Sequence, residues 1–237
     1  MDAQTEVNQR DVASDQWTDW NHIPWNLVTP TVRKLQTRIA KAVQGGNWRR
    51  AKRLQELLTR STAAKASAVR RVTENMGRKT PGVDGETWST PESKWNAVQS
   101  LTLAGYKPQP LRRVHIPKAN GETRPLGIPT MKDRAMQALH LLALDPIAEV
   151  TGDPNSFGFR TERSTADAVV QCKNLLARKD CAKWVLDADI KGCFDNISHD
   201  WLLTHIPLNQ RLLRGWLKCG VVEMGRRSPT VAGTPQG

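Results

Sequence analysis

Hydrophobic residues recur at helical spacing in three consecutive segments near the N-terminus. Over residues 31–44 they lie three or four positions apart, with Lys and Arg mainly off that stripe. Gly45-Gly46 ends this helix, and Asn47 is a suitable cap for a second helix over residues 48–60. A third helix is expected over residues 63–75. This part of the chain is therefore predicted to be a helical extension.

The pattern changes after a Gly- and Pro-rich break at residues 77–85, which predicts a loop. Two alternating segments on either side of Asn120-Gly121 predict a β-hairpin over residues 112–116 and 123–128. The remaining expected elements are helices over residues 90–104, 133–149, 164–178 and 198–203, and a strand over residues 183–190. The predicted fold class is α+β.

The first thirty residues contain a polar segment followed by large aromatic rings. Residues 1–16 lack periodicity, so we expect a flexible tail. Trp17, Trp20 and Trp25 follow, and rings of this size usually mark a segment that docks on the body of the protein. Stacking on nucleobases is the alternative for these tryptophans.

Positive charge is concentrated in one segment. Residues 31–80 carry fourteen basic and two acidic residues, while the formal net charge of the whole chain is +12. Segregated cations of this kind favour binding of polyanions such as nucleic acid, although a solvated helical face is the alternative interpretation. The candidate nucleic-acid-binding residues are Arg33, Lys34, Arg38, Lys41, Arg49, Arg50, Lys52 and Arg53.

Composition excludes several classes of protein. No apolar run approaches the length of a membrane span, and the first thirty residues have no signal-peptide core, so we expect a cytoplasmic protein without a membrane partner. The four cysteines form no C-x-x-C pair, which argues against zinc or a disulfide framework. The five histidines form no arrangement typical of a hydrolase.

Candidate chemistry lies in the segment from Asp187 to Asp195. Side chains alternate along a strand, so Asp187 and Asp189 would share one face. Neighbouring carboxylates repel each other unless a proton or a cation lies between them, which is typical of a divalent-metal site. An isolated pair of this kind is more often two solvated turn aspartates, and Phe194 alone would be a core aromatic.

This segment resembles the first carboxylate block of reverse transcriptases. The resemblance implies that Asp189 and the main-chain carbonyl of Ile190 ligate magnesium, with two Mg²⁺ ions in the complete family enzyme. It also implies that Phe194 lies under the sugar of the incoming deoxynucleotide and disfavours a 2′-hydroxyl.

Further blocks resemble the same family in the same order. Residues 116–129 resemble its fingers hairpin, in which Lys118 and Arg124 would clamp the dNTP triphosphate. Residues 156–160 resemble the next block, where Arg160 would either touch the template backbone or pin its own loop. Residues 233–237 resemble the block that places Gln236 against the nascent base pair. We expect Asp189, Gln236 and the hairpin to share one cleft.

Two segments resemble group II intron reverse transcriptases, or maturases, in particular. They are Lys79-Thr80-Pro81-Gly82-Val83-Asp84-Gly85 and the approach to the hairpin over residues 106–114. The implied organisation is a tail over residues 1–16, a basic RNA-binding extension over 17–80, and right-hand polymerase fingers with a partial palm over 81–237. The implied partners are intron RNA, template RNA with primer DNA, and dNTPs.

The chain departs from this family in one respect. It contains no Asp-Asp dipeptide, and Tyr106 is its only tyrosine, so the Tyr-Ala-Asp-Asp block is missing from these residues. We expect a truncated polypeptide that does not polymerise DNA alone and that exposes Trp184, Leu186 and Trp216 on an incomplete palm. The alternatives are a non-catalytic RNA-binding splicing cofactor, a decayed retroelement remnant, or a retroelement or defence-associated reverse transcriptase.

Overall fold

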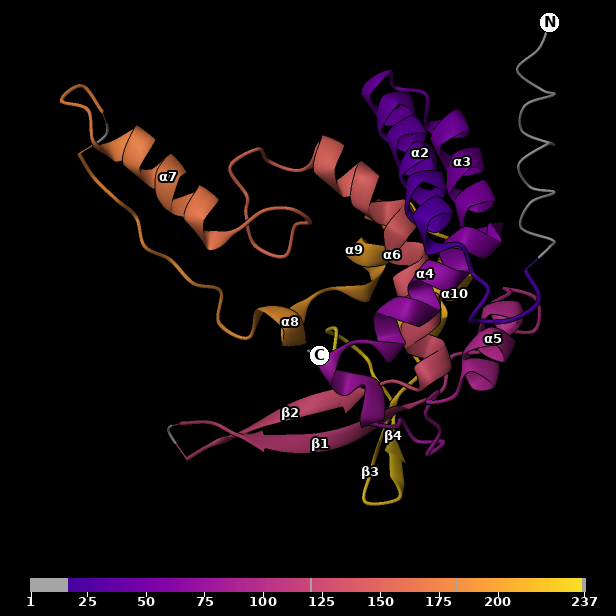
Figure 1. The fold of residues 1–237 in the computed structure, drawn as a ribbon. Helices are drawn as coiled ribbons and strands as arrows, with labels where there is room; N and C mark the ends of the chain where they lie inside the picture. Colours follow the sequence, from indigo (N-terminus) through magenta and orange to yellow (C-terminus); the bar gives the residue numbers. More distant parts are fainter. Residues whose placement is uncertain (1–16, 120, 182, 236–237) are drawn as a thin grey trace, which may run out of the picture.

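A computed structural model describes residues 17–119, 121–181 and 183–235. It confirms the α+β class, with a helical N-terminal part and a mixed sheet (Figure 1). The helices are α2 (Trp25–Gln44), α3 (Trp48–Arg60), α4 (Thr62–Thr73), the 3₁₀ turn η1 (Met76–Lys79), α5 (Pro91–Ser100), α6 (Met131–Thr151), α7 (Thr165–Leu176), α8 (Cys193–Asn196), α9 (His199–His205) and α10 (Gln210–Leu217).

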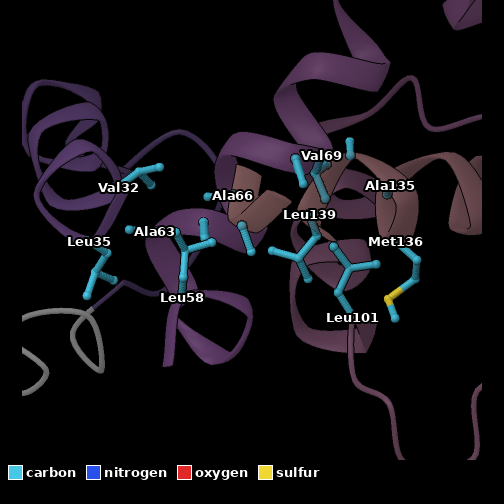
Figure 2. Close-up of a cluster of buried hydrophobic side chains, with 14 of the residues drawn as sticks. Val32, Leu35, Leu58, Ala63, Ala66, Val69, Leu101, Ala135, Met136 and Leu139 are labelled. Carbon is cyan, nitrogen blue, oxygen red and sulfur yellow. The ribbon is translucent and has the colours of Figure 1, made fainter. Parts of the chain in front are cut away.

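One hydrophobic core holds α2, α3, α4, α5 and α6 together. Figure 2 shows Leu58 and Val69 within this cluster, and Leu139 beside Leu101, which follows α5. Burying a side chain of this size stabilises the fold by about 1.5–3 kcal/mol relative to leaving it in water. Because this core contains residues from both sides of residue 80, the helical extension and α6 are packed together; the domain boundary itself stays a prediction.

Local sequence signals place several helix ends where they were expected. The side chain of Asn47 accepts a hydrogen bond from the backbone N–H of Arg50 at 3.0 Å and caps α3. Thr90 and Ser93 form a capping box at α5, and Ser164 and Asp167 form another at α7. Each cap satisfies backbone donors that the first turn of a helix leaves unpaired.

The sheet has the strand order β2-β1-β3-β4. The hairpin of β1 (Leu111–Pro117) and β2 (Thr123–Ile128) is antiparallel, as predicted. β3 (Val221–Glu223) pairs parallel with β1 and antiparallel with β4 (Arg226–Ser228). Met224 and Gly225 join β3 to β4 with positive φ angles of 47° and 78°, the backbone of a tight two-residue hairpin turn.

The tryptophan segment docks on the helical core, as predicted. Trp20 and Ile23 are buried, and Trp17 and Trp25 are partly buried against the same cluster. The ring centroids of Trp20 and Trp25 are 5.1 Å apart in an edge-to-face arrangement, and the Arg70 guanidinium lies 4.7 Å above Trp25. These rings therefore pack against the protein's own side chains rather than serving as surfaces for stacked nucleobases.

Two sequence predictions about the incomplete palm are wrong. Residues 183–190 form no strand and instead belong to a long connection from α7 to α8 that runs apart from the sheet (Figure 1). A strand needs a hydrogen-bonded neighbour, and none of the described strands pairs with this segment. Trp184 and Leu186 are exposed, as expected, but Trp216 packs against the core.

α7 lies away from the helical core, at the far end of this connection (Figure 1). None of its residues is buried, and Val169, Val170, Leu175 and Leu176 are exposed. Within the described residues, no helix is both long enough and apolar enough to cross a membrane.

Candidate functional site

The β1–β2 hairpin and the segment before residue 236 line one cavity of about 630 Å³. Lys118 and Arg124 contribute from the hairpin, as the sequence predicts for a triphosphate clamp, and Arg113 adds a third cation from β1. The carboxylate that lines this cavity is Asp195. Asp189 does not line it, so the expectation that Asp189 shares one cleft with the hairpin is wrong, and Gln236 lies outside the described residues.

Lys118 has a carboxylate partner in this arrangement. Its Nζ lies 3.0 Å from Oε2 of Glu122, and both side chains are solvent-accessible. An exposed ion pair of this kind is worth little, so an incoming phosphate can replace it at small cost. Arg124 is exposed on β2 and can present its planar guanidinium to phosphate oxygens.

The blocks around Asp195 and Gly233 are joined by backbone hydrogen bonds. The Thr234 N–H donates to the Phe194 carbonyl at 2.7 Å, and the Gly233 N–H donates to the Ile197 carbonyl at 2.9 Å. Gly233 has a φ of +77°, and a Cβ there would lie 2.7 Å from the carbonyl oxygens of Phe194 and Asp195. The glycine is therefore required for this close approach.

His199 fixes the same junction, and sequence reasoning missed its contact. The residue is buried at the start of α9, and its Nε2 lies 2.7 Å from the Gly233 carbonyl oxygen. Because a carbonyl only accepts, Nε2 carries the proton. Its buried Nδ1 has no hydrogen-bond partner among the described residues. The serine before it, Ser198, was the sequence signal for the helix start.

The predicted metal ligands do not assemble into a site in this structure. Asp187, Asp189 and Ile190 are exposed in the connection between α7 and α8. No group of three or more His, Cys, Asp or Glu side chains in the described parts of the chain is placed to hold a metal ion. Since Mg²⁺ requires a nearly ideal octahedral oxygen shell, the residues present do not fit the two-ion site.

Arg160 pins the loop between α6 and α7. Its guanidinium donates to Glu149 Oε2 at 2.9 Å and to the carbonyl oxygens of Asp153 and Ser156, and Arg163 binds the same glutamate. The hydrogen bond from Arg163 and the contacts from Arg160 hold the pKa of Glu149 below its ordinary value. Of the two roles considered for Arg160, this geometry favours the pinning role.

The 79–85 block is bound to the start of α6. Arg134 donates to the carbonyl oxygens of Gly77 and Thr80, and Arg112 donates twice to the Pro81 carbonyl at 3.0 and 2.8 Å. A Cβ on Gly82 would lie 2.6 Å from the Cα of Thr130. The block therefore connects the helical extension to the hairpin.

A buried hydrogen-bond network around Asp133 was not predicted. The Tyr106 hydroxyl donates to Asp133 Oδ1 at 2.5 Å and accepts from Trp216 Nε1 at 2.9 Å, while Thr130 donates to Asp133 Oδ2 at 2.8 Å. Burial and the bond to Asp133 raise the pKa of Tyr106 far above its ordinary value. Periodicity along one segment cannot show contacts between residues that are so distant in sequence.

The basic face is formed by α2 and α3, which lie side by side (Figure 1). Arg38 is partly buried, and Arg33 lies 3.5 Å from Glu162 in an exposed ion pair. The other candidate residues are exposed, and within the described residues no carboxylate is within ion-pair distance of them. These exposed cations are Lys34, Lys41, Arg49, Arg50, Lys52 and Arg53.

A cationic hairpin facing a carboxylate-bearing turn, attached to a basic helical extension, is the arrangement expected of a protein of the nucleic-acid polymerase class. Comparison with protein families gives the same assignment. Residues 116–237 match the reverse transcriptase (RNA-dependent DNA polymerase) family, and residues 20–101 match the N-terminal domain of reverse transcriptase. The chain belongs to the reverse transcriptase family.

Several of the individual proteins to which the chain is similar are intron-encoded. The chain is 37% identical over 172 residues to the group II intron-encoded protein LtrA of Lactococcus lactis subsp. cremoris, covering 69% of this chain and 28% of LtrA. It is 35% identical over 202 residues to protein YkfC of Escherichia coli K12, covering 78% of this chain and 52% of YkfC. A putative COX1/OXI3 intron 1 protein of Saccharomyces cerevisiae is 29% identical over 182 residues, covering 72% of this chain and 21% of that protein.

Proposed function

We propose that this chain is the RNA-gripping and fingers part of an RNA-directed DNA polymerase of the group II intron type, acting in intron RNA binding, splicing and retrohoming. The observation that carries the proposal is that one chain presents both a basic α2–α3 face, packed on α6, and a cationic hairpin that leads directly into α6. The match to the family and the similarity to LtrA support it.

Each predicted residue has a role in this proposal. Lys118 and Arg124 hold the triphosphate of the dNTP from the hairpin, beside Asp195 in the same cavity. Phe194, whose ring is 38% exposed, lies under the incoming sugar, and Gln236 lies against the nascent base pair. Asp189 and the carbonyl of Ile190 are proposed to bind magnesium only together with further carboxylates, since alone they do not fit a two-ion site.

Primer extension tests the catalytic half of this assignment. One carboxylate and one carbonyl cannot complete two octahedral magnesium shells, so the 237-residue polypeptide should extend no primer in the presence of Mg²⁺ and dNTPs. Sustained incorporation of nucleotides by the purified polypeptide would contradict the claim that its magnesium ligands are incomplete.

RNA binding tests the other half. Changing Arg49, Arg50, Lys52 and Arg53 together to Glu should weaken binding of structured RNA by at least about tenfold, because each contact with a phosphate is lost and replaced by repulsion. The matched control reverses four exposed cations at and after the end of α7, namely Lys173, Arg178, Lys179 and Lys183. Equal losses in both variants would show only a general effect of net charge.

A non-catalytic RNA-binding splicing cofactor is the second candidate function. The observation behind it is the basic face of α2 and α3, whose exposed cations need no metal ligand to bind RNA. RNA binding and splicing stimulation without any nucleotide incorporation, by any longer form of the protein, would support this candidate over a polymerase.

A further inference from the structure

A second cavity, of about 930 Å³, opens beside the basic face. Its walls come from α3, the start of α4, the connection after α5, α6, and the segment from the end of α9 to the start of α10. It lies outside the hairpin cavity and shares no lining residue with it. The proposed roles of the hairpin and of Asp189 therefore do not use it.

The floor of this cavity is apolar. Its accessible apolar surface comes from partly exposed lining residues, among them Ile206 and Leu208. Leu101, Met136 and Leu139 lie side by side behind this surface, each almost fully buried (Figure 2). Leu103 lines the cavity as well and remains 46% exposed. A floor of this kind favours a flat, weakly hydrated group over a sugar or a phosphate.

Trp48 lines the cavity from the first position of α3 and is directly followed by Arg49 and Arg50. Its indole is 48% exposed, although the other tryptophans near the N-terminus are docked on the core. Within the described residues, no other aromatic ring or cation stacks on Trp48. One large π-face is therefore available beside a row of cations.

Positive charge lines the same cavity. Lys52, Arg60 and Lys65 contribute to it against the single carboxylate of Glu56. None of these cations is in an ion pair within the described residues, and burial lowers the pKa of Lys65. An apolar floor with cations around it is complementary to a base attached to its phosphates.

We propose that this cavity takes one unpaired nucleobase of the RNA held on the α2–α3 face, stacked on Trp48, with its flanking phosphates on Lys52 and Arg60. The inference rests on the proposed RNA-binding function and names which RNA the face prefers. In a duplex the bases are stacked on each other and cannot enter, whereas a loop or a bulge can turn one base outwards. The face therefore selects looped RNA over duplex of equal charge.

Binding of two RNAs separates this selectivity from general affinity. One is a hairpin with an unpaired loop, and the other is a fully paired duplex with the same number of phosphates. Trp48→Ala should weaken hairpin binding by about tenfold, in keeping with base–aromatic stacking, and leave duplex binding within about twofold. Trp48→Phe should restore part of the loss. Trp184→Ala, which removes an indole that is 93% exposed and remote from the cavity, should change neither.

Ala104→Trp gives the same test without removing Trp48. Ala104 lines the cavity from the exposed connection after α5, so a large side chain there should block entry of a base and reproduce the loss for the hairpin alone. Equal losses for both RNAs, or no loss with either variant, would overturn the cavity proposal while leaving RNA binding by the basic face intact. Failure of the wild-type protein to bind either RNA would instead overturn the proposed function.

Competition with a free nucleotide tests whether the cavity binds RNA or a single nucleotide. Adenosine monophosphate at millimolar concentration should not displace the hairpin, because a single nucleotide lacks the contacts to α2 and α3 that hold the RNA. Displacement by this nucleotide, abolished in Trp48→Ala, would show a site for free nucleotides and overturn the assignment to RNA.

Discussion

Gly82 shows how one residue joins two parts of the molecule. Its backbone lies against the Cα and N of Thr130, at 2.6 and 2.7 Å from the position that a Cβ would take. Both neighbouring atoms are backbone, so neither can move aside as a flexible side chain would. The 79–85 block therefore depends on the absence of a side chain at this position.

Gly82→Ala should destabilise the protein by about 1–3 kcal/mol, because the added methyl forces the block away from α6. Urea unfolding followed by circular dichroism measures the change. Gly158→Ala is the matched control, since a Cβ there would meet nothing within 4 Å and the backbone does not have a positive φ. A loss for Gly82→Ala no larger than that of the control would contradict the close packing.

Tyr106, in the connection between α5 and β1, joins α6 and α10 through one hydroxyl. It donates to Asp133 at the start of α6 and accepts from Trp216 in α10. Removal of the hydroxyl leaves a buried carboxylate and a partly buried indole N–H with fewer partners. The effect should therefore exceed the loss of one ordinary exposed hydrogen bond.

Tyr106→Phe is predicted to lower the free energy of unfolding by about 1–3 kcal/mol. Chemical denaturation provides the measurement, with Thr102→Ala as the control, because that hydroxyl is on an exposed residue and makes one long contact of 3.5 Å. The control should stay within about 0.5 kcal/mol of wild type. An unchanged midpoint for Tyr106→Phe would show that the network does not stabilise the fold.

At the scale of elements, periodicity in the sequence was sufficient for the long helices and the hairpin. The stripes of α3 and the turn at Gly121 are local signals, and the structure has both elements at nearly the expected positions. α2 begins at Trp25, earlier than expected, because Pro30 is accommodated within the helix. The signals that specify these elements lie within a few neighbouring residues of the sequence.

Elements that depend on distant partners were not predicted. β3 is only three residues long, and its identity as a strand comes from pairing with β1. Residues 183–190 have a strand-like composition, but pairing decides whether a strand forms, and no described strand lies beside them. The candidate site shows the same difference between local and distant signals. The placement of Lys118 and Arg124 on the hairpin could be predicted from the local sequence. The contact between His199 and Gly233 could not, because it joins residues that are distant in sequence.

At the scale of the whole molecule, the cationic helices and the β1–β2 hairpin are linked through α6. α2 and α3 pack against α6, and α6 follows β2 directly, so α6 connects the basic face to the hairpin. The chain spans about half of YkfC and a smaller part of LtrA.

The dependence of RNA affinity on salt concentration tests this account most directly. If exposed cations of α2 and α3 hold phosphates, the logarithm of the association constant should fall with the logarithm of salt concentration with a slope of about −4 or steeper. The quadruple charge reversal on α3 should make this slope shallower by about 3, while the control on α7 should leave it unchanged. A slope near zero for the wild-type protein, or the same slope for wild type and the α3 variant, would contradict the account.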